Sequence, residues 1–452
     1  MELLDRQRAF FASHATRGLD FRLGALRRLE EAVLAHEQRL VAALQADFRR
    51  SPFETYVTET GLVLGDLRLL RRCLRRWARP ERVPGILANW PSSNHILREP
   101  YGVSLIVGTW NYPFQLAVSP LAGALAAGNC AVLKLSPEAP ATAEAVAAML
   151  GEAFPPEHVA VVQGDRPVLD ALLEERFDHI FCTGSPALGR EVMARAAAHL
   201  TPLTLELGGK CPCIVDADAD LPVAARRIAW GKFLNAGQTC VAPDHLWVHR
   251  SVLPRLVALL KEAVLALYGP DPRAHPDYPR IINARHVARL QGLLGRGRIV
   301  HGGQCVEAER YLAPTLLEDV GLDDPIMQEE IFGPLLPVLP FDTLEEVLIQ
   351  VNARPKPLAL YYFSRDRARQ AQVLGHTSSG AACLNDTVAH VANPNLPFGG
   401  VGASGMGGYH GRASFEAFSH RRAVFSKPTW IDLPLRYAPY AHKLWLVRRL
   451  LG

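Results

Sequence analysis

The sequence predicts an α/β protein with two parallel-sheet domains and a small third unit made of β-strands. The first observation is an alternation of short β-branched runs and helical segments that begins near residue 101. Such alternation is typical of a parallel sheet with helices on both faces. A second alternating region runs from about residue 213 to 385. The third observation is the length, because 452 residues that are about half apolar can form about three domains with full cores.

The N-terminal part is predicted to be helical over residues 20–79. Within residues 66–79, leucines and Trp77 recur at helical spacing, arginines fill the other face, and Pro80 ends the helix. We interpret the arginine face as solvated or salt-bridged. Contact with an acidic lipid or a nucleic acid is the alternative.

The first alternating region has well-marked elements. Predicted strands are 103–109, 131–135, 159–164 and 178–184, with helices at 113–129 and in the intervals that follow. Two further strands lie outside both α/β regions. Residues 81–100 form an arm that resembles a hairpin with a polar turn, and residues 421–428 form a late isolated strand. These two strands indicate a small unit that pairs between subunits.

Composition excludes several classes of protein. The net charge of +4, from 49 basic and 45 acidic residues, gives no support for a nucleic-acid binder. The N-terminus is charged from its second residue, so we expect no signal peptide. No apolar stretch reaches the ~18 residues of a membrane span. The eight cysteines form no CxxC pair, so we expect reduced thiols in a cytoplasmic protein and no metal site.

One cysteine stands apart from apolar packing positions. Cys240 follows the helix-like run 221–234 and a small polar segment that contains Asn235, Gly237 and Gln238. A thiol at the edge of a helix or loop can meet a substrate, and nearby amide dipoles can stabilise its thiolate. Without further information, a packing role remains the alternative for Cys240.

Two glycine-containing motifs are candidates for a turn that binds a phosphate or a dinucleotide. Residues 400–405 match GxGxxG, but no strand precedes them and no acidic residue follows about 20 positions later, so we interpret them as a glycine-rich turn. Residues 184–189, GSPALG, follow a predicted strand and open a helix. Ser185 suits the N-cap and Pro186 the first helical position. Such a turn presents free N–H groups to a phosphate, although a plain capped turn fits the pattern equally well.

Six motifs in order resemble the aldehyde dehydrogenase superfamily along nearly the whole chain. They are GTWNYPF (108–114), FCTGSPALG (181–189), LELGGKCP (205–212), GQTC (237–240), EEIFGP (329–334) and LPFGGVGASGMGGYHG (396–411). The last motif and the short N-terminus are similar to the class-3 branch, which includes fatty and aromatic aldehyde dehydrogenases.

The resemblance implies a reaction and an organisation. An aldehyde, water and NAD or NADP in oxidised form would give a carboxylic acid and the reduced cofactor. Residues 1–80 and 101–207 would form the NAD(P)-binding domain, and residues 208–405 the catalytic domain. Residues 81–100 and 406–452 would form the oligomerisation arm and tail of a homodimer.

The resemblance also assigns catalytic roles. Cys240 matches the family's nucleophile, which forms a thiohemiacetal and then a thioester. Asn111 matches the side-chain donor to the oxyanion, together with the Cys240 N–H. Glu206 matches the general base for the water that attacks the thioester, a role that an apolar surrounding favours. From the residues alone, Asn111 could instead cap the helix near residue 113, and Glu206 could pair with Lys210.

The expected cofactor residues come from three of the motifs and one strand end. They are Lys134 for the adenosine ribose, Gly184, Ser185 and Gly189 for the pyrophosphate, and Glu330 with Phe332 for the nicotinamide ribose. Glu330 could also be a plain charge before a Gly-Pro turn. The chain departs from the family pattern after Lys134, because Pro137 stands where an acid is usual and Glu138 follows one position later.

Two other functions are possible for a protein of this fold. A CoA-acylating aldehyde dehydrogenase on the same fold would not need Glu206, and a catalytically silent relative tends to lose Cys240 or Glu206. Residues 436–452 are basic and apolar but too short to span a membrane. We expect this tail to pack on the partner subunit, with weak contact to a membrane surface as the alternative.

Overall fold

A six-stranded sheet forms the centre of the first lobe in the computed structural model, which describes residues 2–451. Its strand order is β17-β7-β6-β3-β4-β5, and all neighbours are parallel except β17, which is antiparallel to β7. The strands are β3 (Val103–Val107), β4 (Cys130–Lys134), β5 (Val159–Val162), β6 (His179–Thr183), β7 (Leu203–Glu206) and β17 (Gly405–Met406). The predicted parallel α/β organisation of this region is therefore confirmed.

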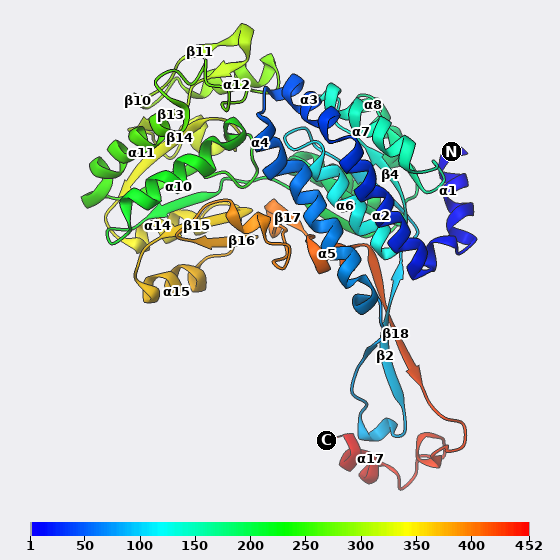
Figure 1. Cartoon of the computed structure of the whole chain (residues 1–452). Helices are drawn as coiled ribbons and strands as arrows, with labels where there is room; N and C mark the ends of the chain where they lie inside the picture. The colour runs from blue at the N-terminus through cyan, green and yellow to red at the C-terminus, as the bar shows by residue number, and fades with distance from the viewer. Residues whose placement is uncertain (1, 452) are drawn as a thin grey trace.

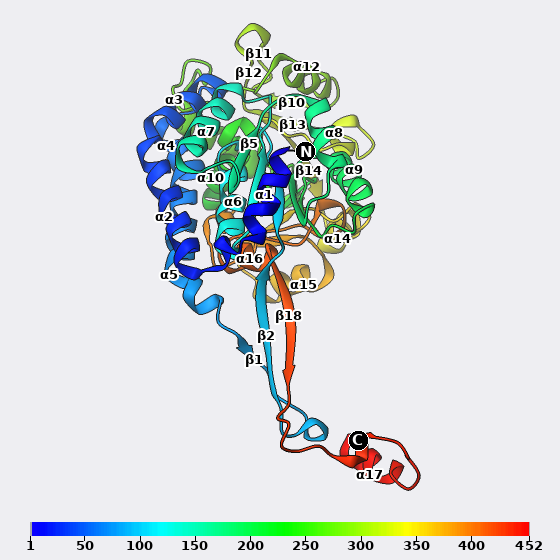
Figure 2. The ribbon, with the colours of Figure 1, turned by 90° about the vertical axis from the view of Figure 1, so that its right-hand side faces the viewer.

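Helices cover both faces of this sheet, as Figure 2 shows. Alternate strand residues point to opposite faces, so Leu105 packs with the apolar side chains of α1, α8 and α9, whereas Ile106 packs with α2, α5, α6 and α7. The helices of this lobe are α1 (Glu2–Ala12), α2 (Leu19–Ala35), α3 (Glu37–Phe48), α4 (Pro52–Thr55), α5 (Gly61–Trp77), α6 (Gln115–Ala127), α7 (Pro140–Ala153), α8 (Arg166–Glu174) and α9 (Pro186–Ala197). A π-helical stretch, residues 56–60, joins α4 to α5.

The second lobe is built on a seven-stranded sheet of order β10-β13-β14-β9-β8-β15-β16. Its strands are β8 (Pro212–Val215), β9 (His245–His249), β10 (Arg298–His301), β13 (Thr315–Glu318), β14 (Leu335–Phe341), β15 (Ala359–Phe363) and β16 (Ala381–Leu384), with a separate pair β11 (Cys305–Val306) and β12 (Tyr311–Leu312). Only the edge strand β10 is antiparallel in the large sheet. The helices are α10 (Leu221–Phe233), α11 (Leu253–Tyr268), α12 (Ala284–Leu293), α13 (Pro325–Gln328), α14 (Leu344–Asn352) and α15 (Arg367–His376).

A long arm projects from the body, with the C-terminal helix at its tip (Figure 1). The arm is a three-stranded antiparallel sheet of β1 (Glu81–Arg82), β2 (Ser93–Pro100) and β18 (Ser419–Ser426). The two stray strands that the sequence predicted thus pair with each other inside one chain, from Pro100 opposite Ser419 to Ser93 opposite Ser426. The tip carries α17 (Leu444–Leu451).

The chain returns to the first lobe before it enters the arm. β17 pairs with β7, and α16 (Gly411–Ala417) packs on α5 and α6. The GxGxxG match, residues 400–405, contains a short turn over residues 402–404 and ends at the first residue of β17. Its interpretation as a turn rather than a dinucleotide fingerprint agrees with this placement.

The structure also bears on the arginine face, the cysteines and membrane-spanning segments. The arginine face of α5 is salt-bridged, since Arg68 and Arg71 pair with Glu30, and Arg75 lies 2.6 Å from Asp20. All eight cysteines are free thiols. Within residues 2–451, no helix combines the length and apolarity that crossing a membrane would require.

Candidate active site

Two cavities meet at Cys240. The first, of about 220 Å³, lies between the lobes and is lined by Thr183, Ser185, Glu206 and Glu330 among others. The second, of about 280 Å³, is lined mainly by apolar side chains. Cys240 lines both cavities and is partly exposed. A thiol at this junction is accessible from both cavities.

The segment before Cys240 explains its position. α10 ends at Phe233, and a tight turn follows in which Asn235, Ala236 and Gly237 all have positive φ, at 52°, 51° and 75°. Gly237 is required here because a Cβ would come within 2.2 Å of the Gly333 carbonyl oxygen. The turn therefore places the segment before Cys240 in contact with the loop that contains Glu330.

The charge environment of Cys240 disfavours the free thiolate. Burial raises the pKa of Cys240 to about 12, and the nearby carboxylates of Glu330 and Glu206 add to the rise. The thiol therefore needs a base, or a neutralising charge in the first cavity, to become a nucleophile.

Asn111 sits in the loop between β3 and α6 and is 2% exposed. Its Nδ2 donates to the Gln238 carbonyl oxygen at 3.1 Å, which places the amide beside the segment that leads to Cys240. This bond uses one of the two N–H donors of the amide. The alternative of a helix cap is wrong, because Phe114 is the N-cap of α6 and no side chain caps it.

Glu206 is the last residue of β7 and is 2% exposed. Its main chain is paired on both sides, opposite Thr183 of β6 and Gly405 of β17. Among the described residues, neither carboxyl oxygen has a hydrogen-bond partner. Burial raises its pKa well above the usual range.

The alternative of a Glu206–Lys210 salt bridge is wrong. Lys210 forms an ion pair with Asp244 and also donates to the carbonyl oxygens of Ile326 and Glu329, at 2.8 and 2.7 Å. Asp244 in turn accepts the N–H of Ile331 at 2.8 Å. This pair anchors the loop that carries Glu330 and leaves Glu206 uncompensated.

The residues expected at the nicotinamide ribose lie in the first cavity. Withdrawal from solvent raises the pKa of Glu330 to about 8, with a further contribution from Asp244. Its carboxylate lies against Gly208, where a Cβ would come within 2.1 Å of Oε2. Phe332 has a φ of 50° and stands edge-on to Trp110, with ring centroids 5.2 Å apart.

The turn expected to bind pyrophosphate is formed as predicted. Ser185 caps α9 by accepting the Leu188 N–H at 3.2 Å, and Pro186 is the first helical residue. Gly184 and Ser185 line the first cavity. Gly189 does not line it; instead it lets α9 approach the sheet, because a Cβ there would come within 2.7 Å of Leu207.

Lys134 ends β4 and also lies outside the lining of the first cavity. It is 4% exposed, its Nζ donates to the Leu135 carbonyl oxygen at 2.8 Å, and burial lowers its pKa. Glu138 turns toward the second lobe, where it accepts from Asn283 and from Arg285, the latter at 2.8 Å. The displaced acid is therefore already engaged.

The first cavity suits a dinucleotide. It joins the N-terminal end of α9, whose free N–H groups and dipole favour a phosphate, to an unpaired buried acid and an aromatic wall. Thr183 Oγ1 is also buried there without a partner among the described residues. Within the same residues, no group of three or more His, Cys, Asp or Glu side chains could hold a metal ion.

Sequence reasoning missed several residues of this site. His286 and Arg289 of α12 line the first cavity from the second lobe. Arg289 also donates to the carbonyl oxygen of Glu330 at 3.3 Å. No motif marks these two residues, since they occur in an ordinary amphipathic helix. Trp110 could have been found, because it directly precedes Asn111 in the same motif.

The comparisons with known proteins agree with this geometry. The aldehyde dehydrogenase family profile matches residues 5–424. The dimeric NADP-preferring aldehyde dehydrogenase of Canis lupus familiaris is 44% identical over 98% of both chains. Aldehyde dehydrogenase family 3 member B1 of Mus musculus is 46% identical over 97% of this chain and 94% of its own. A solved structure described as the substrate-bound state of Staphylococcus aureus AldH superposes with a TM-score of 0.98 and 41% identity, covering 100% of this chain and 99% of that one. The chain belongs to the aldehyde dehydrogenase family, as its motifs predicted.

Proposed function

We propose that the chain oxidises an uncharged, apolar aldehyde to the carboxylic acid, with NAD or NADP in the first cavity and the aldehyde in the second. The observation that carries this proposal is the position of Cys240 at the junction of the two cavities. The second cavity is walled by side chains such as Leu62, Trp230 and Phe398, and none of its lining residues is Asp, Glu, Lys or Arg.

In the proposed mechanism, the Cys240 thiol releases its proton to solvent and the thiolate adds to the aldehyde carbon, and the new oxyanion accepts hydrogen bonds from Asn111 Nδ2 and the Cys240 N–H. A bound NAD or NADP would supply the acceptor for the hydride that leaves this carbon. Glu206 then takes a proton from water, which attacks the Cys240 thioester. The carboxylic acid leaves as the Cys240 sulfur takes the proton held by Glu206, which restores both the thiol and the Glu206 carboxylate. Glu330, Phe332, Gly184 and Ser185 would hold the cofactor.

The activity test uses a panel of apolar and charged aldehydes. The carboxylic acid and the reduced cofactor that form are both quantified, in the absence of CoA. We expect hexanal and benzaldehyde to exceed glyoxylate and betaine aldehyde in kcat/KM by at least about 100-fold, because an unpaired charge is costly in an apolar cavity. Acid must form in equal amount to the reduced cofactor. Dependence on CoA would support the CoA-acylating alternative, and no turnover at all would support the silent one.

Cofactor choice follows from the engaged acid after Lys134. An acid at the adenosine ribose favours NAD by accepting from the 2′-hydroxyl and repelling a 2′-phosphate. Pro137 can do neither, and Glu138 is bound to Asn283 and Arg285. We expect kcat/KM for the two cofactors to agree within about tenfold, or ~1.4 kcal/mol. Pro137→Glu should shift the ratio toward NAD.

The matched control for this prediction is Glu138→Gln. It should change the NAD-to-NADP ratio by less than about threefold, since Glu138 is expected to face away from the ribose. A wild-type preference for NAD above about a thousandfold would contradict the argument, as would a shift of tenfold or more toward NADP in Glu138→Gln.

The proposed assembly is a homodimer, in which residues 81–100 and 406–452 form the arm and tail. Residues 1–80 and 101–207 would form the NAD(P)-binding domain, and residues 208–405 the catalytic domain. One relative is described as dimeric. The arm tip exposes Trp90, Trp430 and Trp445 by 62%, 75% and 64%, which a second copy would cover. Contact of this tip with a membrane surface is the alternative.

Free thiols support a reducing cytoplasmic location. Sedimentation and cell fractionation test these two proposals.

A further inference from the structure

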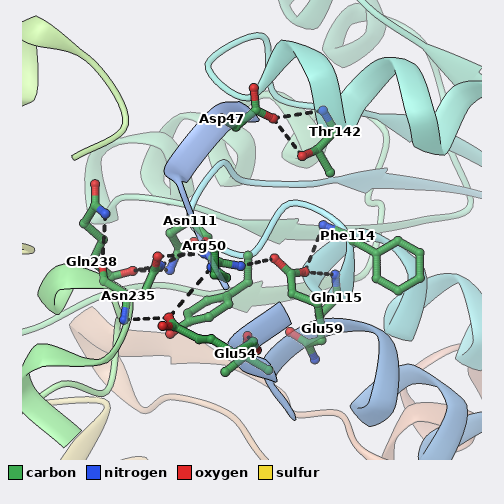
Figure 3. A network of polar contacts seen from close by, with 12 residues as sticks. Asp47, Arg50, Glu54, Glu59, Asn111, Phe114, Gln115, Thr142, Asn235 and Gln238 are labelled. Carbon is green, nitrogen blue, oxygen red and sulfur yellow. Dashed lines mark hydrogen bonds and ion pairs between the residues drawn. The ribbon is translucent and has the colours of Figure 1, made fainter. Parts of the chain in front are cut away.

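One buried arginine connects three segments of the chain through hydrogen bonds (Figure 3). Arg50 lies between α3 and α4, and its side chain is fully buried. Its guanidinium donates to Glu59 at 2.6 Å, to the Asn111 carbonyl oxygen at 2.8 Å and to Asn235 Oδ1 at 2.7 Å. None of the motifs that marked the site contains Arg50, and it lines neither cavity at Cys240.

The contacts of Arg50 hold the main chain of Asn111 from behind. The Asn111 carbonyl oxygen accepts from Arg50 and also from Asn235 Nδ2, at 2.8 and 2.9 Å. The same Asn235 amide donates to the Gln238 carbonyl oxygen at 3.1 Å, the atom that also accepts from Asn111 Nδ2. Asn111 and the turn before Cys240 are therefore fixed to each other through Arg50 and Asn235.

Two buried carboxylates complete this network. Glu59 accepts the N–H groups of Phe114 and Gln115, at 3.1 and 2.7 Å, and so anchors the start of α6 just after Asn111. Glu54 accepts the main-chain N–H of Asn235 at 2.8 Å. Packing also restricts the guanidinium, since its carbon lies 4.7 Å from the ring centre of Phe48 and 5.0 Å from that of Tyr112.

We propose that Arg50 is a positioning residue that aligns the Asn111 amide with the oxyanion formed at Cys240. This inference rests on the role of Asn111 given under Proposed function. A fork with two donor nitrogens, packed against two aromatic rings, reaches three acceptors here, whereas a lysine ammonium cannot reproduce that geometry. A displacement of about 1 Å at such a donor can cost up to ~100-fold in rate.

The test is a double-mutant cycle of Arg50→Lys and Asn111→Ala, with kcat/KM measured per titrated thiol at position 240. We expect Arg50→Lys to lower kcat/KM by about 10- to 100-fold in the wild-type background. In the Asn111→Ala background the same change should cost less than about threefold, because no amide remains to be aligned. The cofactor KM should change less than about threefold, since Arg50 does not line the first cavity.

The control is Arg22→Lys. Arg22 is also a buried arginine, but it donates to the Thr16 carbonyl oxygen and lies against Gly128, at the opposite end of α6 from Asn111. It should lower Tm but leave kcat/KM within about threefold. Equal losses for Arg50→Lys in both backgrounds, or a loss below threefold in the wild-type background, would overturn the inference.

Two further measurements distinguish a misfolded variant, and a wrong role for Asn111, from a failure of the inference about Arg50 itself. If Arg50→Lys does not fold, Asn235→Gly replaces it in the cycle, because glycine keeps the positive φ of that turn and removes all three hydrogen bonds of the Asn235 side chain. It should show the same dependence on Asn111. If Asn111→Ala alone retains full activity, the oxyanion role of Asn111 itself is wrong, and the inference about Arg50 falls with it.

Discussion

Replacing Cys240 by alanine is expected to lower kcat for aldehyde oxidation by at least about 10⁴-fold, the scale of loss when a covalent nucleophile is removed. The reason is geometric, because Cys240 lines both the cavity assigned to the cofactor and the apolar cavity assigned to the aldehyde. Cofactor affinity should stay within about threefold of wild type, since the residues proposed to hold the cofactor are untouched. Steady-state rates and a cofactor titration measure the two quantities.

The control for this prediction is Cys305→Ala. Cys305 is another partly exposed free thiol, but it lies on β11 and lines neither cavity at Cys240. Its loss should leave kcat within about twofold of wild type. If Cys240→Ala kept a tenth or more of wild-type kcat, Cys240 would have no place in the mechanism.

Local sequence signals predicted the two α/β lobes well. β-branched runs that alternate with helices can bury apolar surface on both faces only as a parallel sheet, and this rule located β3 to β6 within a few residues. The cap at Ser185 was equally local, because the hydroxyl needs only the N–H three residues later. The partner of the late strand 421–428 was not predictable in this way, since β18 pairs with β2 more than 300 residues earlier.

The resemblance to the family assigned Cys240 and Asn111 to the candidate site, each from a motif that contains the side chain and its backbone setting. The structure brings the two segments together through Gln238. Arg50 could not be found in this way. It belongs to a charged stretch, ADFRRSPFE, in which every arginine looks like a surface residue, and its burial depends on Glu59 and on two distant loops. Charged residues are almost never fully buried unless paired, and the pairing is a tertiary property.

The ion-pair partner of Lys210 likewise depends on the tertiary structure and could not be found from sequence spacing. Four residues after Glu206, Lys210 was a natural salt-bridge candidate by spacing, but β7 ends at Glu206 and the following glycines let the chain turn away. Lys210 meets Asp244 instead, which is 34 positions later in the sequence. The consequence for function is large, because an unpaired Glu206 keeps a raised pKa that a salt bridge would lower.

Replacing Glu206 by glutamine is expected to lower steady-state kcat by about 10²- to 10³-fold, within the usual range for removal of a general base. Hydride transfer precedes the water step, so a burst of up to one reduced cofactor per active site should survive. The enzyme should then accumulate as an acyl thioester on Cys240. Rapid-mixing absorbance measures the burst, and intact-protein mass spectrometry measures the added acyl mass. A variant without the burst would show that Glu206 also deprotonates Cys240.

The pH dependence of kcat distinguishes a general base at Glu206 from a buried carboxylic acid that has no catalytic role. Only the ionised Glu206 can take a proton from water, and burial raises its pKa, so wild-type deacylation should rise with pH as that proton is lost. Glutamine has no such proton, so this rising limb should be absent from the kcat profile of Glu206→Gln. Glu138→Gln, an acid-to-amide change outside the proposed catalytic group, should keep the limb. Normal turnover in Glu206→Gln, or an unchanged rising limb, would exclude Glu206 as the base and leave the thioester to be hydrolysed by another group.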